Sequence, residues 1–212
     1  MKKVSIVVLA LIAPCVAMAE NKKTETFIPD YTYMGLRLSK SMGTRLKTDG
    51  VYNDKNYGHS RWAYPLGYGL ILGNRFNDNM RLELELDYMT ADAEALKRNE
   101  TDKFRSAAVL GNFYWNGAEY FKAVPYLGIG VGVVGSSVKY DLPGGSNYSG
   151  SDPAFAYQFS TGLEFILNEY VNVDLGFRWR NFGTVRARDD LGDNHYTRAN
   201  AWQFYAGMAY KW

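Results

Sequence analysis

The sequence predicts an all-β protein: an eight-stranded antiparallel transmembrane β-barrel with an up-and-down meander topology. Three observations lead to this expectation. They are an export signal at the N-terminus, long segments in which apolar and polar residues alternate with a period of two, and connections that are alternately long and short. No segment after the export signal has the ~18 consecutive apolar residues of a transmembrane helix, which excludes a helical inner-membrane protein.

The first 19 residues have the pattern of a cleaved secretory signal. Lys2 and Lys3 precede an apolar run, and the small residues Ala17 and Ala19 place the cleavage before Glu20. The apolar run is shorter than the ~20 residues that a membrane-spanning helix needs, so we expect it to be removed. The predicted division is therefore a signal peptide at 1–19, a periplasmic N-terminal extension at 20–30 and the outer-membrane β-barrel domain at 31–212.

Cleavage at this position also changes the composition of the mature chain. Cys15 is the only cysteine, and although its setting loosely resembles a lipoprotein signal, Pro14 fits that pattern poorly. Its removal excludes disulfides, thiol nucleophiles and cysteine metal sites. Without Lys2 and Lys3, 22 basic residues face 22 acidic ones. A net charge near zero does not indicate a nucleic-acid partner.

The segment 80–88 shows the period of two most clearly. Its apolar residues alternate with Arg81, Glu83, Glu85 and Asp87, so one face is apolar and the other is charged. Taken alone, this segment favours an ordinary soluble antiparallel strand with its apolar side inward. The repeats at 154–168 and 171–180 are longer, however, and match the ~9–11 residues of a tilted transmembrane strand better than the ~5–6 of a soluble one.

The strands and connections can be placed along the whole mature chain. We predict strands at residues 31–40, 62–73, 80–90, 104–115, 124–138, 154–167, 171–182 and 199–212. The long connections are 41–61, 91–103, 139–153 and 183–198, and the short ones are 74–79, 116–123 and 168–170. Outer-membrane barrels have short periplasmic turns and long extracellular loops, so we expect both termini in the periplasm.

If the apolar faces meet lipid, the charged faces line the lumen. Isolated charges would be strongly destabilising there, so we expect them to pair in a network. The predicted members are Arg37, Arg81, Glu83, Glu85, Asp87, Glu164, Asp174, Arg178, Arg180 and Lys211, with Gln158, Gln203 and Tyr205 on the same face. The interior of an eight-stranded barrel is just wide enough to be filled by side chains, which favours a plug over a pore.

A run of alternating glycines lies in the segment 126–133. The alternation predicts that Leu127, Ile129, Val131 and Val133 point outward, and that Gly128, Gly130 and Gly132 point inward and leave room for bulky neighbours. The spacing G-x-G-x-G differs from the G-x-G-x-x-G of dinucleotide sites, and no βαβ unit follows. We therefore expect no cofactor, and no metal site is indicated.

The end of the sequence alternates down to a terminal aromatic residue, through Phe204, Met208, Tyr210 and Trp212. With this ending and the segments 33–38 and 124–132, the chain resembles the small outer-membrane β-barrel family, typified by the OmpA transmembrane domain, OmpX and the porin-like surface antigens. The resemblance implies that the barrel-assembly machinery recognises the last strand, with these four residues as the assembly signal. Full-length OmpA-type proteins carry a peptidoglycan-binding domain after the barrel, whereas here we expect none after Trp212.

The sequence favours a structural or surface-interaction role, adhesin-like or antigen-like, through four extracellular loops that contain Tyr52, Tyr57, His59, Tyr148 and Tyr196. The expected partners are outer-membrane lipid, lipopolysaccharide and a host or surface ligand. The alternatives are a narrow porin-like channel for ions or small solutes, a barrel enzyme that modifies lipid A, and a soluble lipocalin-type barrel with its leucines inside.

An enzyme of this kind needs a nucleophile and a base held close together. The two histidines, His59 and His195, fall in predicted loops, with Ser60 beside one and Asp193 near the other. No His-x-Ser spacing occurs, and solvated side chains are the usual contents of such loops. We therefore predict no catalytic residues.

Overall fold

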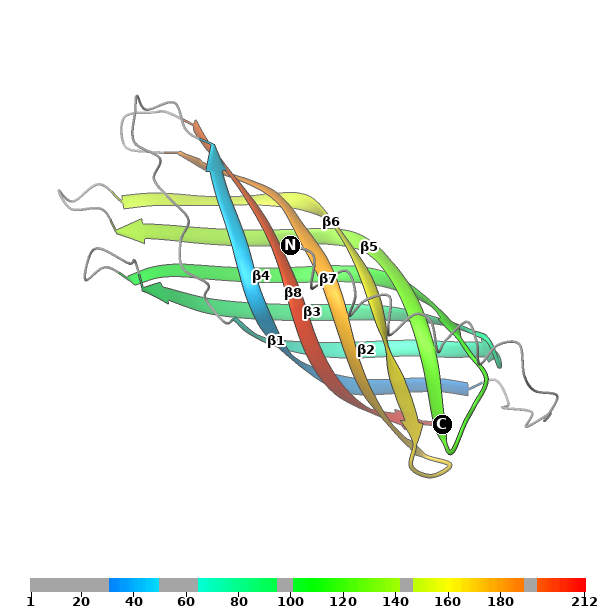
Figure 1. Ribbon diagram of the computed structural model, residues 1–212. Coiled ribbons are helices and arrows are strands. Elements are labelled where there is room, and N and C mark those ends of the chain that lie inside the picture. The colour runs from blue at the N-terminus through cyan, green and yellow to red at the C-terminus, as the bar shows by residue number, and fades with distance from the viewer. Residues whose placement is uncertain (1–30, 50–64, 95–100, 142–146, 189–193) are drawn as a thin grey trace, which may run out of the picture.

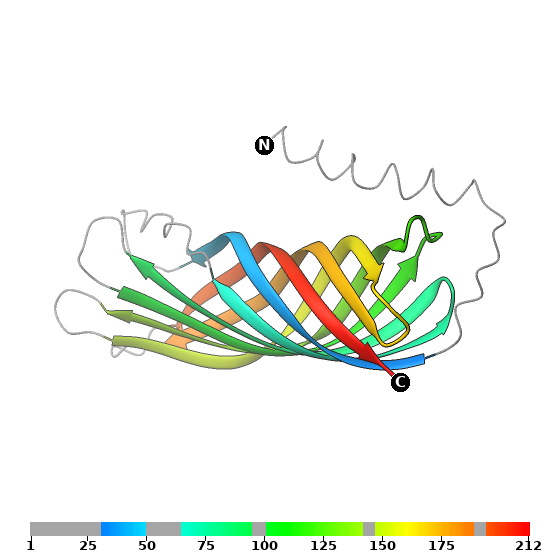
Figure 2. The same ribbon diagram turned by 90° about the horizontal axis from the view of Figure 1, so that it is seen from below.

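The computed structural model describes residues 31–49, 65–94, 101–141, 147–188 and 194–212. They form β1 (Tyr31–Asp49), β2 (Leu66–Asn77), β3 (Met80–Glu94), β4 (Thr101–Asn116), β5 (Ala123–Asp141), β6 (Asn147–Ile166), β7 (Val171–Arg188) and β8 (Asn194–Lys211). Each strand pairs antiparallel with the next, and β1 closes the barrel on β8. The predicted eight-stranded meander is confirmed, and Figures 1 and 2 show its tilted strands.

The outward face of the barrel is apolar, and the charged side chains lie on the inward face. In β3, Leu82, Leu84 and Leu86 are each about half exposed, whereas Glu83 and Glu85 are buried inside the barrel. A soluble lipocalin-type barrel would have the opposite arrangement, so that alternative is wrong for this chain. None of the described residues forms a helix that is long and apolar enough to cross a membrane.

Strands continue into all four segments that the sequence predicted as long connections. β1 extends to Asp49 by pairing with β8 up to Tyr196, and β5 pairs with β6 up to Asp141 and Asn147. A bulge between Ser41 and Thr44 lets β1 continue. The prediction was wrong here because it required apolar alternation, whereas the ladder is formed by backbone hydrogen bonds that polar residues also make.

The boundaries of β2 also differ from the prediction of 62–73. Pro65 precedes the strand, and its carbonyl oxygen accepts a hydrogen bond of 2.9 Å from the backbone N–H of Ser41. The strand then runs through Arg75 to Asn77, and the connection to β3 is reduced to two residues. Asn77 Oδ1 caps this turn by accepting from the N–H of Asn79 at 2.9 Å. The predicted turn 74–79 was too long because its asparagines suggested a turn throughout.

The turn between β4 and β5 has a left-handed backbone at two residues that are not glycine. Phe121 has a φ of 49° and Lys122 a φ of 63°. Around them, Tyr120 and Ala123 exchange two backbone hydrogen bonds of 2.9 Å. Positive φ at both central residues defines a type I′ hairpin turn, for which Asn-Gly is strongly preferred. Phe and Lys therefore leave conformational strain in this turn.

Replacing Phe121→Asn and Lys122→Gly together is expected to stabilise the barrel by about 1–3 kcal/mol, because both new residues adopt positive φ more easily. Little packing is lost, since Phe121 is 86% exposed. Urea unfolding in lipid vesicles measures the effect. Phe121→Ala alone is the control, since alanine still opposes positive φ, and a double variant no more stable than this control contradicts the strain.

Candidate functional site

The lumen is the candidate site because it gathers polar side chains from all eight strands. The structure buries every member of the predicted network: Arg37, Arg81, Glu83, Glu85, Asp87, Glu164, Asp174, Arg178, Arg180 and Lys211. Gln158, Gln203 and Tyr205 are buried with them. They reach the lumen because successive side chains of a strand point to opposite faces of the sheet.

Glu85 is the centre of the network. Its carboxylate accepts from Arg178 Nη1 at 2.5 Å, from Arg180 Nη2 at 3.1 Å and from Arg37 Nη1 at 3.3 Å. The amides of Asn112 and Gln158 also donate to it, at 3.1 and 3.3 Å. A fully buried carboxylate needs such partners, since its own desolvation is strongly unfavourable.

Asp87 extends this centre along β3. It accepts from Arg180 Nη1 at 2.6 Å and from Arg178 Nη2 at 3.2 Å. Two carboxylates on β3 thus pair with two guanidinium groups on β7, a strand that neighbours neither β3 nor its partners in the barrel. These ion pairs therefore cross the lumen rather than run along its wall.

Arg37 connects the ion pairs around Glu85 to a neighbouring group of side chains, the layer around Arg37. Its guanidinium lies 3.0 Å from Glu83 Oε1 and 2.8 Å from Asp174 Oδ2, so it joins carboxylates of β3 and β7 from its place on β1. Tyr33 donates to Glu83 at 2.9 Å. The layer around Arg37 is consequently linked to three strands of the wall.

Buried tyrosines complete this layer, and sequence reasoning had assigned only Tyr205 to the lumen. Tyr114 donates to Glu83 at 3.2 Å, Tyr126 donates to Asp174 at 2.5 Å, and the hydroxyls of Tyr126 and Tyr205 lie 2.7 Å apart. The guanidinium of Arg81 lies over the rings of Tyr114 and Tyr126, 4.4 and 4.7 Å from their centroids. Cation–π contacts of this kind help to compensate a buried charge.

The end of the lumen near the short turns holds a further cation that was not predicted. Arg75 is fully buried and pairs with Glu164, whereas the sequence placed it in a turn. Asn172 donates to Glu164 at 2.7 Å, and Arg81 lies 3.3 Å from it. Lys211 donates to the backbone carbonyl of Asn168 at 3.0 Å. The alternation could have placed Arg75 inside, had β2 been extended past Gly73.

A cluster of apolar side chains lies in the described lumen beside the charged network. Met89, Ala108, Leu110, Val134, Ala156, Phe182 and Ala201 form one buried cluster. Arg180 lies beside this cluster, 5.7 Å above the ring of Phe182. The sequence had predicted the charged network but not this cluster, whose apolar residues occupy inward positions of several strands.

The glycine run of β5 makes room for the lumen side chains, as the sequence predicted. A Cβ atom on Gly128 would collide with the ring of Tyr114, and one on Gly130 would collide with the amide of Asn112. Leu127, Ile129, Val131 and Val133 point outward. Tyr114 donates to Glu83 and Asn112 donates to Glu85, so the two side chains that these glycines accommodate belong to the network.

The described lumen holds almost balanced charge. Its buried cations are Arg37, Arg75, Arg81, Arg178, Arg180 and Lys211, and its buried anions are Glu83, Glu85, Asp87, Glu164 and Asp174. Within the described ranges, no group of three or more acidic, histidine or cysteine residues could hold a metal ion. Side chains that pair with one another across the lumen brace the wall, which is the role that this arrangement can perform.

The remaining predicted residues lie on the surface or outside the described part. Phe204, Met208, Tyr210 and Trp212 point outward, each more than half exposed. Their role as an assembly signal stays a prediction. Residues 17–20 at the predicted cleavage site lie outside the described residues, as do Tyr52, Tyr57, His59, Ser60 and Asp193. His195, Tyr148 and Tyr196 belong to described strands, but their side chains are outside the description.

Comparison with known proteins agrees with this architecture. The sequence profile of a family described as outer membrane protein beta-barrel domain matches residues 6–211. None of the curated proteins matches the sequence.

Three solved structures illustrate the likeness. The neisserial surface protein NspA is 19% identical, with a TM-score of 0.54 over 85% of this chain and 97% of that one. OprG from Pseudomonas aeruginosa is 15% identical, with a TM-score of 0.56 over 88% and 97%. Ail from Yersinia pestis, in complex with a heparin analogue, is 14% identical, with a TM-score of 0.50 over 87% and 100%. At these identities the likeness concerns the fold.

Proposed function

Because the chain belongs to the outer membrane protein β-barrel domain family, we propose that it is a closed outer-membrane barrel that acts through surface contacts rather than by conducting solutes. In this proposal residues 1–19 direct export, both termini lie in the periplasm, and the segments between the long strand pairs face the exterior. The partners are lipopolysaccharide around the barrel and a host or surface ligand at its outer end.

The observation that carries this proposal is the set of ion pairs across the lumen. Arg178 and Arg180 of β7 pair with Glu85 and Asp87 of β3 at 2.5–3.2 Å, and the apolar cluster around Phe182 lies beside them. An eight-stranded barrel has only enough interior for such side chains. A solute would have to separate buried, mutually paired charges, which is unfavourable.

The strand lengths support a role at the surface. A tilted strand crosses the bilayer in ~9–11 residues. β5, β6, β7 and β8 have 19, 20, 18 and 18 residues. The additional residues of these strands extend the hydrogen-bonded barrel wall beyond the membrane. This extension can present the outer segments to a partner. Ail, which has this fold, was crystallised with a heparin analogue, so such a barrel is compatible with ligand contact.

Conductance of the purified protein in planar lipid bilayers tests the proposal. We expect no stable openings from the wild-type barrel. A variant with Glu85→Ser, Asp87→Ser, Arg178→Ser and Arg180→Ser, which removes both members of each pair across the lumen, is the positive control and is expected to conduct. Stable wild-type openings that survive repurification would establish the channel alternative. The proposal includes no enzymatic activity, and a lipid A mass profile that changes with expression would contradict that part.

A further inference from the structure

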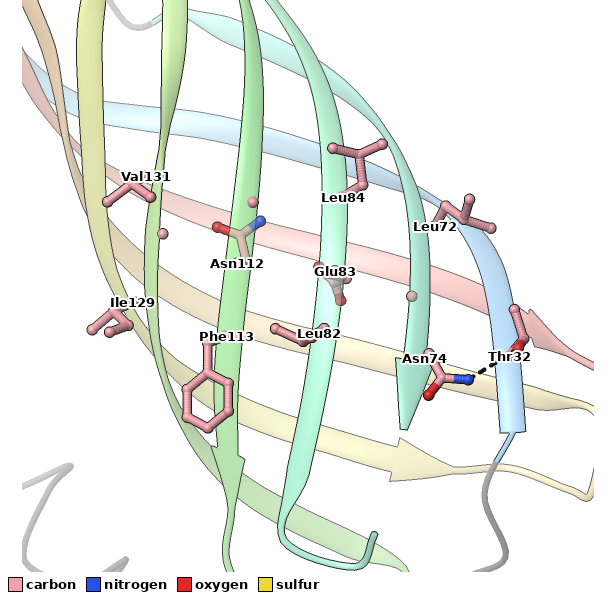
Figure 3. Close-up of a pocket in the computed structure, with 13 residues that line it drawn as sticks. Thr32, Leu72, Asn74, Leu82, Glu83, Leu84, Asn112, Phe113, Ile129 and Val131 are labelled. Atoms are coloured by element: carbon pink, nitrogen blue, oxygen red, sulfur yellow. Dashed lines mark hydrogen bonds between the residues drawn. The ribbon is translucent and has the colours of Figure 1, made fainter. Parts of the chain in front are cut away.

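A shallow groove crosses the outer, lipid-facing surface over β2, β3, β4 and β5, with a volume of about 590 Å³ (Figure 3). Two adjacent rows of outward side chains border it. One row joins Leu84, Gly111 and Val131 by strand pairing, and the next row joins Leu82, Phe113 and Ile129. Leu72 lies beside Leu84 at the start of the first row.

Gly111 interrupts the first row of side chains and leaves the backbone exposed at the floor of the groove. A Cβ atom there would meet nothing closer than 3.9 Å, so the surrounding packing leaves room for a side chain. Gly128 and Gly130, in contrast, are needed because Tyr114 and Asn112 occupy the space beside them. Glycine weakens a strand interior, and it often marks a place where a ligand approaches the backbone closely.

One end of the groove is polar. Asn74 Nδ2 donates to Thr32 Oγ1 at 3.1 Å, both residues line the groove, and this hydrogen bond is exposed. Thr32 is the second residue of β1, and Asn74 lies close to the end of β2, so the pair sits near the short turns. Away from this pair, the outward side chains that line the groove are leucine, isoleucine, valine and phenylalanine (Figure 3).

We propose that this groove binds one acyl chain of a phospholipid from the leaflet nearest the short turns. The chain lies over Gly111, and the ester region of the lipid contacts Thr32 and Asn74. The chain belongs to an outer-membrane β-barrel family, and the groove is continuous with the outward apolar surface of the barrel. Acyl chains of the membrane surround this surface, so one of them is the expected occupant. In hydrocarbon, close packing rather than water exclusion favours association, and a groove provides more contacts than a flat wall.

Photo-crosslinking to a lipid tests the site. The barrel is reconstituted in vesicles of phosphatidylethanolamine and phosphatidylglycerol that contain a phosphatidylethanolamine with a diazirine on one acyl chain, and labelled residues are mapped by mass spectrometry. Label is expected to concentrate on the residues that border the groove. Gly111→Leu, which fills the groove, is expected to reduce that label by about threefold or more, because it replaces the packing contacts of the chain.

Gly135→Leu is the matched control. Gly135 also points outward with nothing within 4 Å of a Cβ atom, but it does not line the groove, so its variant is expected to label like the wild type. Heat-modifiable migration confirms that each variant is folded, and Gly111→Val replaces Gly111→Leu if the latter does not assemble. Even labelling of all strands, or labelling of the groove that Gly111→Leu leaves unchanged, would each overturn the proposal. None of these readouts depends on whether the lumen conducts.

Discussion

Glu85→Leu is expected to destabilise the barrel by about 3–5 kcal/mol, because removing one carboxylate of a buried ion-pair network leaves an excess of buried positive charge. The groups affected are the guanidinium groups of Arg178, Arg180 and Arg37, which lie 2.5, 3.1 and 3.3 Å from this carboxylate. Urea unfolding in lipid vesicles measures the loss. Glu85→Gln is expected to cost less, since its amide oxygen still accepts hydrogen bonds.

The neighbouring position separates this effect from a general sensitivity of β3. Leu86 points toward lipid and is about half exposed. Leu86→Ala is expected to cost much less than Glu85→Leu, because lipid tails are as apolar as the leucine that they replace.

A second variant tests the pairing itself. Adding Arg180→Leu to Glu85→Leu is expected to restore part of the stability, since the loss of one guanidinium offsets the loss of one carboxylate in the lumen. Arg180→Leu alone completes the cycle. If the stability lost in the double variant equals the sum of the losses in the two single variants, the two residues are not coupled across the lumen.

The members of this network could be predicted from the sequence, but their pairing could not. Period-two alternation is a local property, so it places Glu85 and Arg178 on the inward face without knowledge of the fold. Which charges meet depends on the register of all the strands between them: Arg178 and Glu85 are 93 residues apart. A one-residue shift in any ladder would move the whole face of a strand.

The parts of the lumen that were missed have physical reasons of their own. Arg75 lies among asparagines that are typical of turns, and its pairing with Tyr31 of β1 and Arg81 of β3 shows that the strand includes it. Met89, Leu110 and Phe182 are apolar residues at inward positions. The prediction assigned apolar residues to the lipid-facing side, so it could not place them in the lumen. The groove over Gly111 likewise exists only because the register places Leu84 and Val131 on either side of it.

The lipid-facing surface should respond to charge according to depth. An arginine on the lipid face costs ~2–4 kcal/mol at the bilayer midplane and ~0–1 kcal/mol near the interfaces, where its side chain can reach water. Met80 is the first residue of β3, beside the short turn, and Leu86 lies six positions further along the same outward face. Leu86→Arg is therefore expected to lose far more stability than Met80→Arg in urea unfolding from vesicles.

The costs of the two arginine variants also indicate where the hydrocarbon region lies along β3. Both positions are outward and partly exposed, so differences in lumen packing do not contribute. Tyr88→Arg extends the series, because Tyr88 is the next outward residue toward the end with the longer connections. A cost that is largest at Leu86 and smaller at both neighbours would centre the hydrocarbon on the middle of the predicted segment 80–90. Equal costs at all three positions would mean that this face is not in contact with hydrocarbon, since charge on a water-exposed strand face is tolerated at any height.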